Sequence, residues 1–440
     1  MTAFLVAGLS YGDEGKGASV DYLCRHNPVH TVVRYNGGAQ CAHNVCTPEG
    51  KHFRFSQFGS GTLIPKVRTH LSRYMLVNPL FLMQEEQNLR KVGVKDAYDR
   101  LTVERRALVT NPFQIAVNRI RETVRDQGGA DYWRGRHGSC GMGIGETMSD
   151  SLNFGDALRI GDLENPEVAQ RKLETSRERK LQEIGKLGKL PDAAQQELAV
   201  LQGSGVVEAC LRHYKTFVES VRLVDEDYLT NILDRSGDIV FEGAQGILLD
   251  QDYGWHPHTT WTDITFSNAD KLLADYDGPT QRIGIMRCYT TRHGPGPFVT
   301  ESSDLIINER HNTWGEWQRS FRVGHFDLVA TRYALEVLGG VDEIFVNCID
   351  HVDGKVKCAE SYTIGVGDSI ERLHPAGNLT AQTILTNRLF TAKPAYSEYD
   401  DVELLILVLE DKLDTPITLG AYGPTAKDRS PFIRTHVAIH

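Results

Sequence analysis

The chain has 440 residues, of which 40% are hydrophobic and 24% charged, a composition typical of a globular protein with a sizeable buried core. Its 48 basic and 58 acidic residues give a formal net charge of −10, which argues against nucleic acid as a partner. The opening MTAFLVAGL lacks the basic start of a signal peptide, and no apolar run approaches the roughly 20 residues that span a membrane, so we expect no membrane partner. Eight scattered cysteines without CxxC pairs indicate reduced thiols and a cytoplasmic protein.

In chain order, the predicted elements alternate between short strands and helices. Residues 3–9 are a predicted strand, followed by a glycine-rich turn and a helix over residues 15–26. A second clear helix is predicted at residues 326–338. Further apolar runs rich in β-branched residues are typical of strands buried on both faces, and they lie at residues 30–35, 238–243, 283–289, 343–348 and 416–422. The alternation predicts an α/β fold with a large, mostly parallel central sheet covered by helices, in a single domain over residues 1–440.

Residues 164–222 differ in kind from the rest of the chain. They are rich in Glu, Lys, Gln and Leu, which indicates a helical excursion from the main domain. We expect this helical excursion to be broken near Gly188 to Pro191. The high charge predicts that this segment is exposed to solvent.

The stretch VAGLSYGDEGKGASV, residues 6–20, resembles a phosphate-binding P-loop with two departures. Ser10 stands where the first glycine belongs, and Gly17 replaces the hydroxyl residue that helps to hold Mg²⁺. A strand, a glycine turn and a helix still place backbone N–H groups and Lys16 where they can bind phosphate. Asp13 lies inside this loop, where an anion is repelled by phosphate unless it ligates a metal ion or handles a proton. Both roles indicate phosphoryl chemistry with Mg²⁺.

Three further stretches are VVRYNGGAQCAHN at residues 32–44, FEGAQGILLDQDYG at 241–254 and CYTTRHGPGPFVTE at 288–301. Together with SYGDEGKGA at residues 10–18, they resemble the motifs of the adenylosuccinate synthetase family, in the same order. The resemblance runs from residue 4 to about residue 425, which is nearly the whole chain.

The resemblance implies a reaction and its catalytic residues. Asp13 would take the N1 proton of a hypoxanthine ring, so that O6 attacks the γ-phosphate of GTP, and His43 would stabilise the leaving group. The amine of aspartate then displaces the phosphoryl group from C6. Lys16 and Gln245 are the other implied catalytic residues, and Asp13 with the backbone carbonyl of Ala42 would bind Mg²⁺.

The resemblance also implies binding residues for each substrate. Those for the nucleotide phosphates are Gly12, Glu14, Gly15, Gly17 and Asn44. Those for the purine substrate are Gln40, Cys41, Ser139, Cys140 and Thr260. Arg319 would grip the amino acid, and Asp350 and Gly423 would contact guanine. The family implies small-molecule substrates and a homodimer.

Several positions depart from the family pattern. Cys140 replaces a threonine that binds phosphate, and Met142 replaces an arginine that contacts the amino acid. The arginine that crosses the dimer interface in the family is replaced near Phe154. A charge-assisted contact is worth about 1.5–3 kcal/mol, so either other residues compensate or the substrates differ.

IMP and aspartate are therefore the expected substrates, with three alternatives. One is GMP or dGMP, as in the phage branch that makes 2-aminoadenylosuccinate, although that branch usually carries serine at the position of Asp13. Another is a different amino acid. The third is a non-catalytic nucleotide sensor, against which the retention of Asp13, Lys16, His43 and Gln245 argues.

Overall fold

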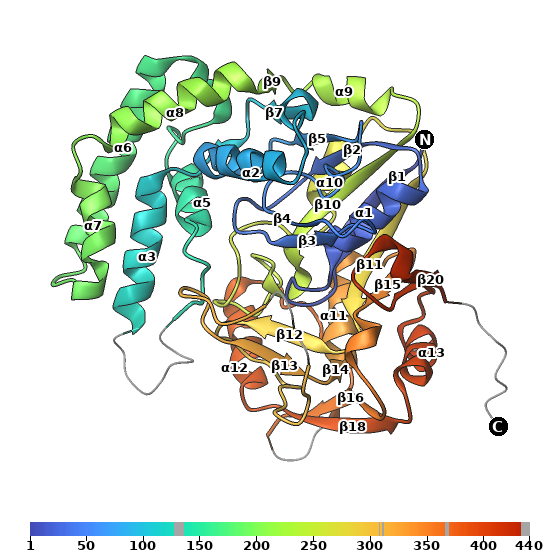
Figure 1. The fold of residues 1–440 in the computed structure, drawn as a ribbon. Helices are drawn as coiled ribbons and strands as arrows, with labels where there is room; N and C mark the ends of the chain where they lie inside the picture. Colours follow the sequence, from blue (N-terminus) through green and yellow to red (C-terminus); the bar gives the residue numbers. More distant parts are fainter. Residues whose placement is uncertain (127–135, 308, 310–311, 366–368, 433–440) are drawn as a thin grey trace.

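The computed structural model describes residues 1–126, 136–307, 309, 312–365 and 369–432. Its centre is a ten-stranded sheet with the order β20-β19-β15-β11-β1-β10-β2-β5-β7-β9 (Figure 1). Neighbouring strands are parallel except β19 and β20, which are antiparallel. The strands are β1 (Ala3–Gly8), β2 (Val29–Arg34), β5 (Arg68–Leu71), β7 (Leu101–Glu104), β9 (Arg222–Val224), β10 (Asp238–Gly246), β11 (Thr280–Arg287), β15 (Glu343–Asn347), β19 (Ile417–Ala421) and β20 (Arg429–Pro431).

The six apolar runs predicted as strands form six adjacent strands, β19 to β2, so this part of the fold prediction is confirmed. β1 is buried along its whole length and pairs on one side with β10 and on the other with β11, where Leu5 lies opposite Phe241 and Arg282 respectively. Because parallel strands end at the same edge, the loops after β1, β10, β11, β15 and β19 meet there. That edge is where the predicted site residues gather.

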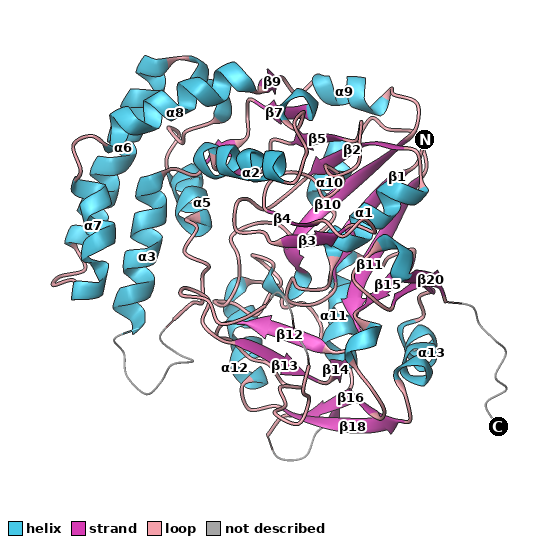
Figure 2. Cartoon of the chain, viewed as in Figure 1, coloured by secondary structure: helices cyan, strands magenta, loops and turns pink. Residues whose placement is uncertain are grey.

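Helices cover both faces of this sheet. Side chains of a strand alternate between faces, and Leu5 belongs to the same apolar cluster as Tyr333 of α11 (Leu328–Leu338). Its neighbour Val6 instead packs in the cluster that contains Val20 and Leu23 of α1 (Lys16–His26). Outside the helical lobe that lies to one side of the sheet, the remaining helices are α2 (Pro79–Lys91), α9 (Tyr228–Leu233), α10 (Ser267–Leu272), α12 (Leu379–Leu389) and α13 (Val402–Leu413) (Figure 2).

A helical lobe lies to one side of the sheet (Figure 1). It consists of α3 (Pro112–Asp126), α5 (Ile144–Asn153), α6 (Pro166–Gly185), α7 (Gln195–Gln202) and α8 (Val206–Ser220). The segment 164–222 is therefore helical as expected, and α6 ends before the predicted break. It is less exposed than its charge predicts, because Leu173, Ile184 and Phe217 are buried in a shared apolar cluster.

Smaller sheets flank the central one. β3 (His43–Cys46) pairs with β4 (His52–Phe55), β6 (Leu76–Val77) with β8 (Leu108–Val109), and β12 (Thr290–His293) with β13 (Phe321–Gly324). A further sheet contains β14 (Phe326–Asp327), β16 (Val356–Thr363), β17 (Ser369–Ile370) and β18 (Lys393–Tyr399). Within the described ranges, no helix is long and apolar enough to cross a membrane.

Candidate active site

A cavity of about 380 Å³ opens where the loops after β1 and β10 meet β3, β12 and the helical lobe. The predicted site residues that line it are Gly12, Asp13, Gln40, Cys41, Ala42, His43, Ser139, Cys140, Gln245 and Thr260. These residues come from five separate stretches of the sequence. The fold therefore brings the implied base, histidine and purine-binding residues into one space.

Glu14 occupies the inner side of the phosphate loop. Its Oε1 accepts hydrogen bonds from the backbone N–H groups of Ser10 at 3.0 Å and Gly12 at 2.7 Å. Its Oε2 lies 2.8 Å from Nζ of Lys16, which also donates to the carbonyl of Gly12 at 2.9 Å. The loop is thus held by its own ion pair, and Lys16, at 2% exposure, does not line the cavity.

Two glycines of the loop permit close packing. Gly15 has a φ of +91°, and a Cβ there would lie 2.8 Å from the amide nitrogen of Asn347, which donates to the carbonyl of Glu14. Gly17 lies against His43, since a Cβ added to it would come within 2.8 Å of the Cβ of His43. The glycine that replaces the usual P-loop hydroxyl therefore makes room for the histidine.

His43 is held by Glu242, a residue that the sequence analysis did not single out. Nδ1 of His43 lies 2.5 Å from Oε1 of Glu242, whose other oxygen accepts from the backbone N–H of Ser60 at 2.9 Å. Burial alone would raise the pKa of Glu242, but the guanidinium of Arg34 and the hydrogen bonds from His43 and Ser60 lower it to about 2. Burial lowers the pKa of His43 despite this carboxylate. Glu242 lies inside the FEGAQG motif, so the motif itself was the available signal.

Asp13 lies at the cavity wall with its side chain 21% exposed. Its Oδ2 is 3.6 Å from Nε2 of His293, an ion-pair distance, and its backbone carbonyl accepts a hydrogen bond from Nε of Arg287 at 2.5 Å. Asp13 and the backbone of Ala42 line the same cavity, and both offer the hard oxygen ligands that Mg²⁺ prefers. Since Mg²⁺ is commonly bound through one or two carboxylates with water and substrate phosphates, this donor set fits it.

The two predicted purine-side glutamines differ in their contacts. Gln245 has a φ of +62°, and its Oε1 accepts from Oγ1 of Thr262 at 3.4 Å. Both polar atoms of the Gln40 side chain are buried without a hydrogen-bond partner among the described residues. A buried amide without partners has its full hydrogen-bonding capacity left for a ligand.

Sequence reasoning missed the cations and histidines of the cavity wall. The additional charged or titratable lining residues include Arg54, Arg121, Glu122, Arg125, His137, Glu146, Arg292 and His293. His293 stands in the quoted CYTTRHGPG stretch, where the family pattern has valine, so it was open to detection. His256 and His258 also line the cavity, and burial is the first cause that lowers the pKa of each, that of His258 to about 3.

Other predicted residues do not line this cavity. Arg319 pairs with Asp126 at 2.7 Å and has its guanidinium 5.4 Å from the ring centre of Trp314. Oδ1 of Asn44 accepts a hydrogen bond from Nε2 of His52 at 3.0 Å. Asp350 and Gly423 follow β15 and β19, which are neighbours in the sheet, so they share its carboxyl edge. The roles of these residues, of Lys16, Glu14, Gly15 and Gly17, and of the residues that line the cavity all remain predictions.

Comparison with known proteins agrees with this arrangement. The model of the family described as adenylosuccinate synthetase matches residues 5–424. The chain belongs to the adenylosuccinate synthetase family. It is therefore a GTP-dependent ligase of purine biosynthesis, in a family that also depends on Mg²⁺.

Relatives match over nearly the whole chain. The adenylosuccinate synthetase of Mycobacterium tuberculosis is 31% identical over 453 residues, covering 96% of this chain and 96% of the relative. That of Mycobacterium avium is 31% identical over 407 residues, covering 90% of this chain and 86% of the relative.

Two solved structures share the fold. Fully ligated adenylosuccinate synthetase from Plasmodium falciparum has a TM-score of 0.78 at 22% identity, covering 97% of this chain and 98% of that one. Succinoaminodeoxyadenylate synthetase of cyanophage S-2L, bound to dGMP and to dATP as an energy donor, has a TM-score of 0.57 at 17% identity, covering 98% and 95% of the two chains. At these identities the likeness establishes the fold alone.

Proposed function

We propose that this ligase joins L-aspartate to C6 of IMP, with GTP as the phosphoryl donor, and forms adenylosuccinate. The observation that carries the proposal is that Asp13, His43 and Gln245, which come from three distant motifs, line one cavity. Membership of the family supports the reaction class.

In the proposed mechanism Asp13 is the general base. Its carboxylate removes the proton from N1 of the purine, which makes O6 the nucleophile that attacks the γ-phosphate of GTP. The amine of aspartate then attacks C6, the C6–O6 bond breaks, and O6 leaves as part of inorganic phosphate. Asp13 is suited to the role because its carboxylate reaches the cavity while Arg287 holds its backbone in place.

His43 acts on the leaving side of the phosphoryl transfer. The carboxylate of Glu242 fixes Nδ1–H, so Nε2 is the nitrogen that would face the oxygen between the β- and γ-phosphorus atoms of GTP, and it donates a proton or hydrogen bond there when the ring is protonated. Glu242 is charged because its pKa lies at about 2, and it would stabilise a protonated His43. Asp13 and Ala42 would hold Mg²⁺, which neutralises charge on the phosphates when bound.

Met142 favours a second candidate function, in which the amino acid differs from aspartate or the acceptor is GMP or dGMP. Its side chain packs against the apolar cluster of Leu76, Leu108 and Ile144, so it supplies no cation to an amino-acid carboxylate. The cavity also offers the buried Gln40 amide, which has no hydrogen-bond partner in the part of the chain that the structure describes, and its carbonyl could accept a hydrogen bond from the 2-amino group of GMP or dGMP.

A substrate panel tests the proposal. Purified protein with GTP, Mg²⁺ and aspartate is assayed against IMP, GMP and dGMP by phosphate release and by identification of the product. We expect turnover with IMP, and Asp13→Asn should lower kcat by roughly 10²–10⁴-fold while nucleotide binding persists. Turnover with GMP or dGMP instead would reassign the acceptor, turnover only with another amine would reassign the amino acid, and binding without turnover would indicate a nucleotide sensor.

A further inference from the structure

One wall of the cavity is formed by the helical lobe. Asn118, Arg121, Glu122 and Arg125 of α3 line it, and their spacing of three and four residues places them on one face of the helix. The first turn of α5, from Ile144 to Glu146, lines the same wall and contributes the positive end of its dipole. This wall therefore combines two arginines with a helix start.

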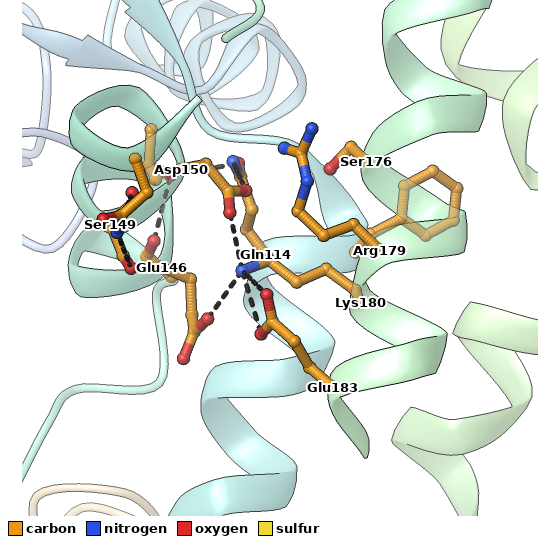
Figure 3. Close-up of polar contacts among 12 residues, drawn as sticks. Gln114, Glu146, Ser149, Asp150, Ser176, Arg179, Lys180 and Glu183 are labelled. Carbon is orange, nitrogen blue, oxygen red and sulfur yellow. Dashed lines mark hydrogen bonds and ion pairs between the residues drawn. The ribbon is translucent and has the colours of Figure 1, made fainter. Parts of the chain in front are cut away.

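Behind that wall lies a buried ion cluster centred on Lys180 of α6 (Figure 3). Nζ of Lys180 is 2.8 Å from Oε2 of Glu146, 2.8 Å from Oδ1 of Asp150 and 3.3 Å from Oε2 of Glu183, and its side chain is 1% exposed. Asp150 is held further by the amide of Gln114, which donates to its Oδ2 at 2.8 Å. The cluster ties α3, α5 and α6 together, so it fixes the wall from behind.

Arg121 joins this cluster to the cavity. Its Nε is 3.2 Å from Oε1 of Glu146 and its Nη2 is 2.6 Å from Oε2 of Glu183, the same two carboxylates that Lys180 contacts. Its Nε is buried yet makes no well-directed hydrogen bond. The side chain is 35% exposed and lines the cavity. Lys180 shares these carboxylates with Arg121, and the Arg121 side chain lines the cavity, so part of its fork is open to an anion there.

The position of the wall favours a phosphate group over an amino-acid carboxylate. The amino acid must reach C6 of the purine, next to Asp13, which follows β1 in the sheet (Figure 1). The 5′-phosphate is at the far end of the same nucleotide, and α3 and α5 belong to the lobe beside the sheet. Hydroxyls of Ser139, Ser149 and Thr260 also line the cavity and can complete the hydrogen bonds of a phosphomonoester.

We infer that Arg121 binds the phosphomonoester of the acceptor nucleotide from within the same chain, and that Lys180 is the positioning residue that holds Arg121 through Glu146 and Glu183. The inference rests on the proposed function for the identity of the acceptor. It assigns a role to the helical lobe, which supplies the cation of a site whose base comes from the sheet. A guanidinium suits the task because its planar fork matches two phosphate oxygens.

Calorimetric titration of GTP, IMP and inosine into wild-type protein and Arg121→Gln tests the inference. The variant should bind IMP about 10–100-fold more weakly, the loss expected for a charge-assisted contact, and should bind inosine and GTP within about twofold of wild type. Arg105→Gln is the matched control, because Arg105 also bridges two carboxylates, Glu164 and Asp225, and does not line the cavity. Unchanged IMP affinity, or an equal loss for IMP and inosine, would overturn the inference.

The test separates this inference from the proposed function. If turnover occurs with GMP or dGMP instead of IMP, the same titrations use that nucleotide and its nucleoside, and the selectivity for phosphate is read in the same way. Absence of turnover with every nucleotide would contradict the proposed function, whereas the difference between nucleotide and nucleoside would still be measured.

A double-mutant cycle tests the role of Lys180. Lys180→Gln should weaken nucleotide binding, and adding it to Arg121→Gln should cause little further loss, because both act on one contact. Lys180→Arg should restore most of the affinity for the nucleotide. Lys172, on the same helix as Lys180, pairs with Asp162, and Lys172→Gln should leave that affinity unchanged. If Lys180→Gln does not fold, Lys180→Gln/Asp150→Asn also removes the buried carboxylate that loses its cation and leaves both partners of Arg121 in place, and additive losses in either version would refute the positioning role.

Discussion

Nδ1 of His43 lies 2.5 Å from Oε1 of Glu242, with the histidine 6% exposed and the glutamate fully buried. The pair joins β3 to β10 next to Gly17 of the phosphate loop, and Arg34 keeps Glu242 charged. The charge of this buried carboxylate is stabilised when the protein folds, so little further free energy is needed to reorganise it during the reaction. His43 is therefore fixed in orientation before any nucleotide binds.

Glu242→Gln should impair catalysis more than binding. The amide keeps the shape of the side chain but removes the charge that stabilises a protonated His43, so we expect kcat to fall by roughly 10²-fold or more. The KM for GTP should change by less than about threefold, since Glu242 does not line the cavity. Steady-state kinetics measure both, and Ser60→Ala, which removes one hydrogen bond to Glu242, is the control that should retain most activity. An unchanged kcat would show that the pair is structural.

Gly17→Ala should displace His43. Alanine favours a helix over glycine by about 1 kcal/mol, so α1 alone would gain stability. The added Cβ, however, would lie 2.8 Å from the Cβ of His43 and 3.1 Å from Oγ of Ser60, and overpacking of this kind costs about 1–3 kcal/mol. We expect a lower kcat with a lower or unchanged melting temperature. Gly205→Ala, where a Cβ meets nothing within 4 Å, is the matched control, and full activity of Gly17→Ala would contradict the packing argument.

The central strands could be predicted because each is buried on both faces and so consists of apolar residues. β5 and β7, with sequences RTHL and LTVE, escaped prediction because they are only four residues long and half polar. Their polar groups are satisfied by distant partners, as when the ring of His70 bonds Thr102 across the two strands. Such partners are invisible in a local pattern.

The site was partly predictable for a similar reason. Asp13, His43 and Gln245 stand in dense motifs, so their types and spacing indicated chemistry. Arg121 and Lys180 stand in ordinary charged helical sequence, where most arginines and lysines are solvated. Only the packing of α6 against α3 and α5 distinguishes them, and that packing joins residues about 60 positions apart.

Asp350→Ala tests the predicted guanine pocket. A carboxylate accepts hydrogen bonds from the N1 and N2 groups of guanine, whereas adenine offers no such pair of donors. Asp350 is 35% exposed at the carboxyl edge of the sheet, so its removal should not disturb folding. We expect the ratio of kcat/KM for GTP to that for ATP to fall by about tenfold or more, consistent with a loss of about 1.5–3 kcal/mol. An unchanged ratio would place the donor base elsewhere.

His70 should make the protein less stable in acid. It is 1% exposed in β5, and burial, followed by the charge of Arg235, lowers its pKa from 6.5 to about 3. As the pH falls below 6.5 the unfolded chain takes up a proton on this imidazole and the folded chain does not. The unfolding free energy therefore falls by up to about 1.4 kcal/mol per pH unit from this residue, down to a pH near its folded pKa. Above pH 6.5 the imidazole of His70 is neutral in both states, so this loss of unfolding free energy is absent.

His70→Gln should therefore show its largest cost at neutral pH. The variant loses packing and the 3.0 Å contact with Thr102, which lowers its unfolding free energy at neutral pH. It has no imidazole at this position to take up a proton on unfolding, so it escapes the acid destabilisation of the wild type. Its deficit in unfolding free energy relative to wild type should therefore shrink as the pH is lowered from 7 to about 5. Urea unfolding at several pH values measures that difference, in which other titrating groups cancel. Thr102→Val is the control, because it loses the contact yet keeps the buried imidazole, so its deficit should persist in acid. A deficit of His70→Gln that stays constant or grows as the pH falls would show that the imidazole is protonated in the folded protein.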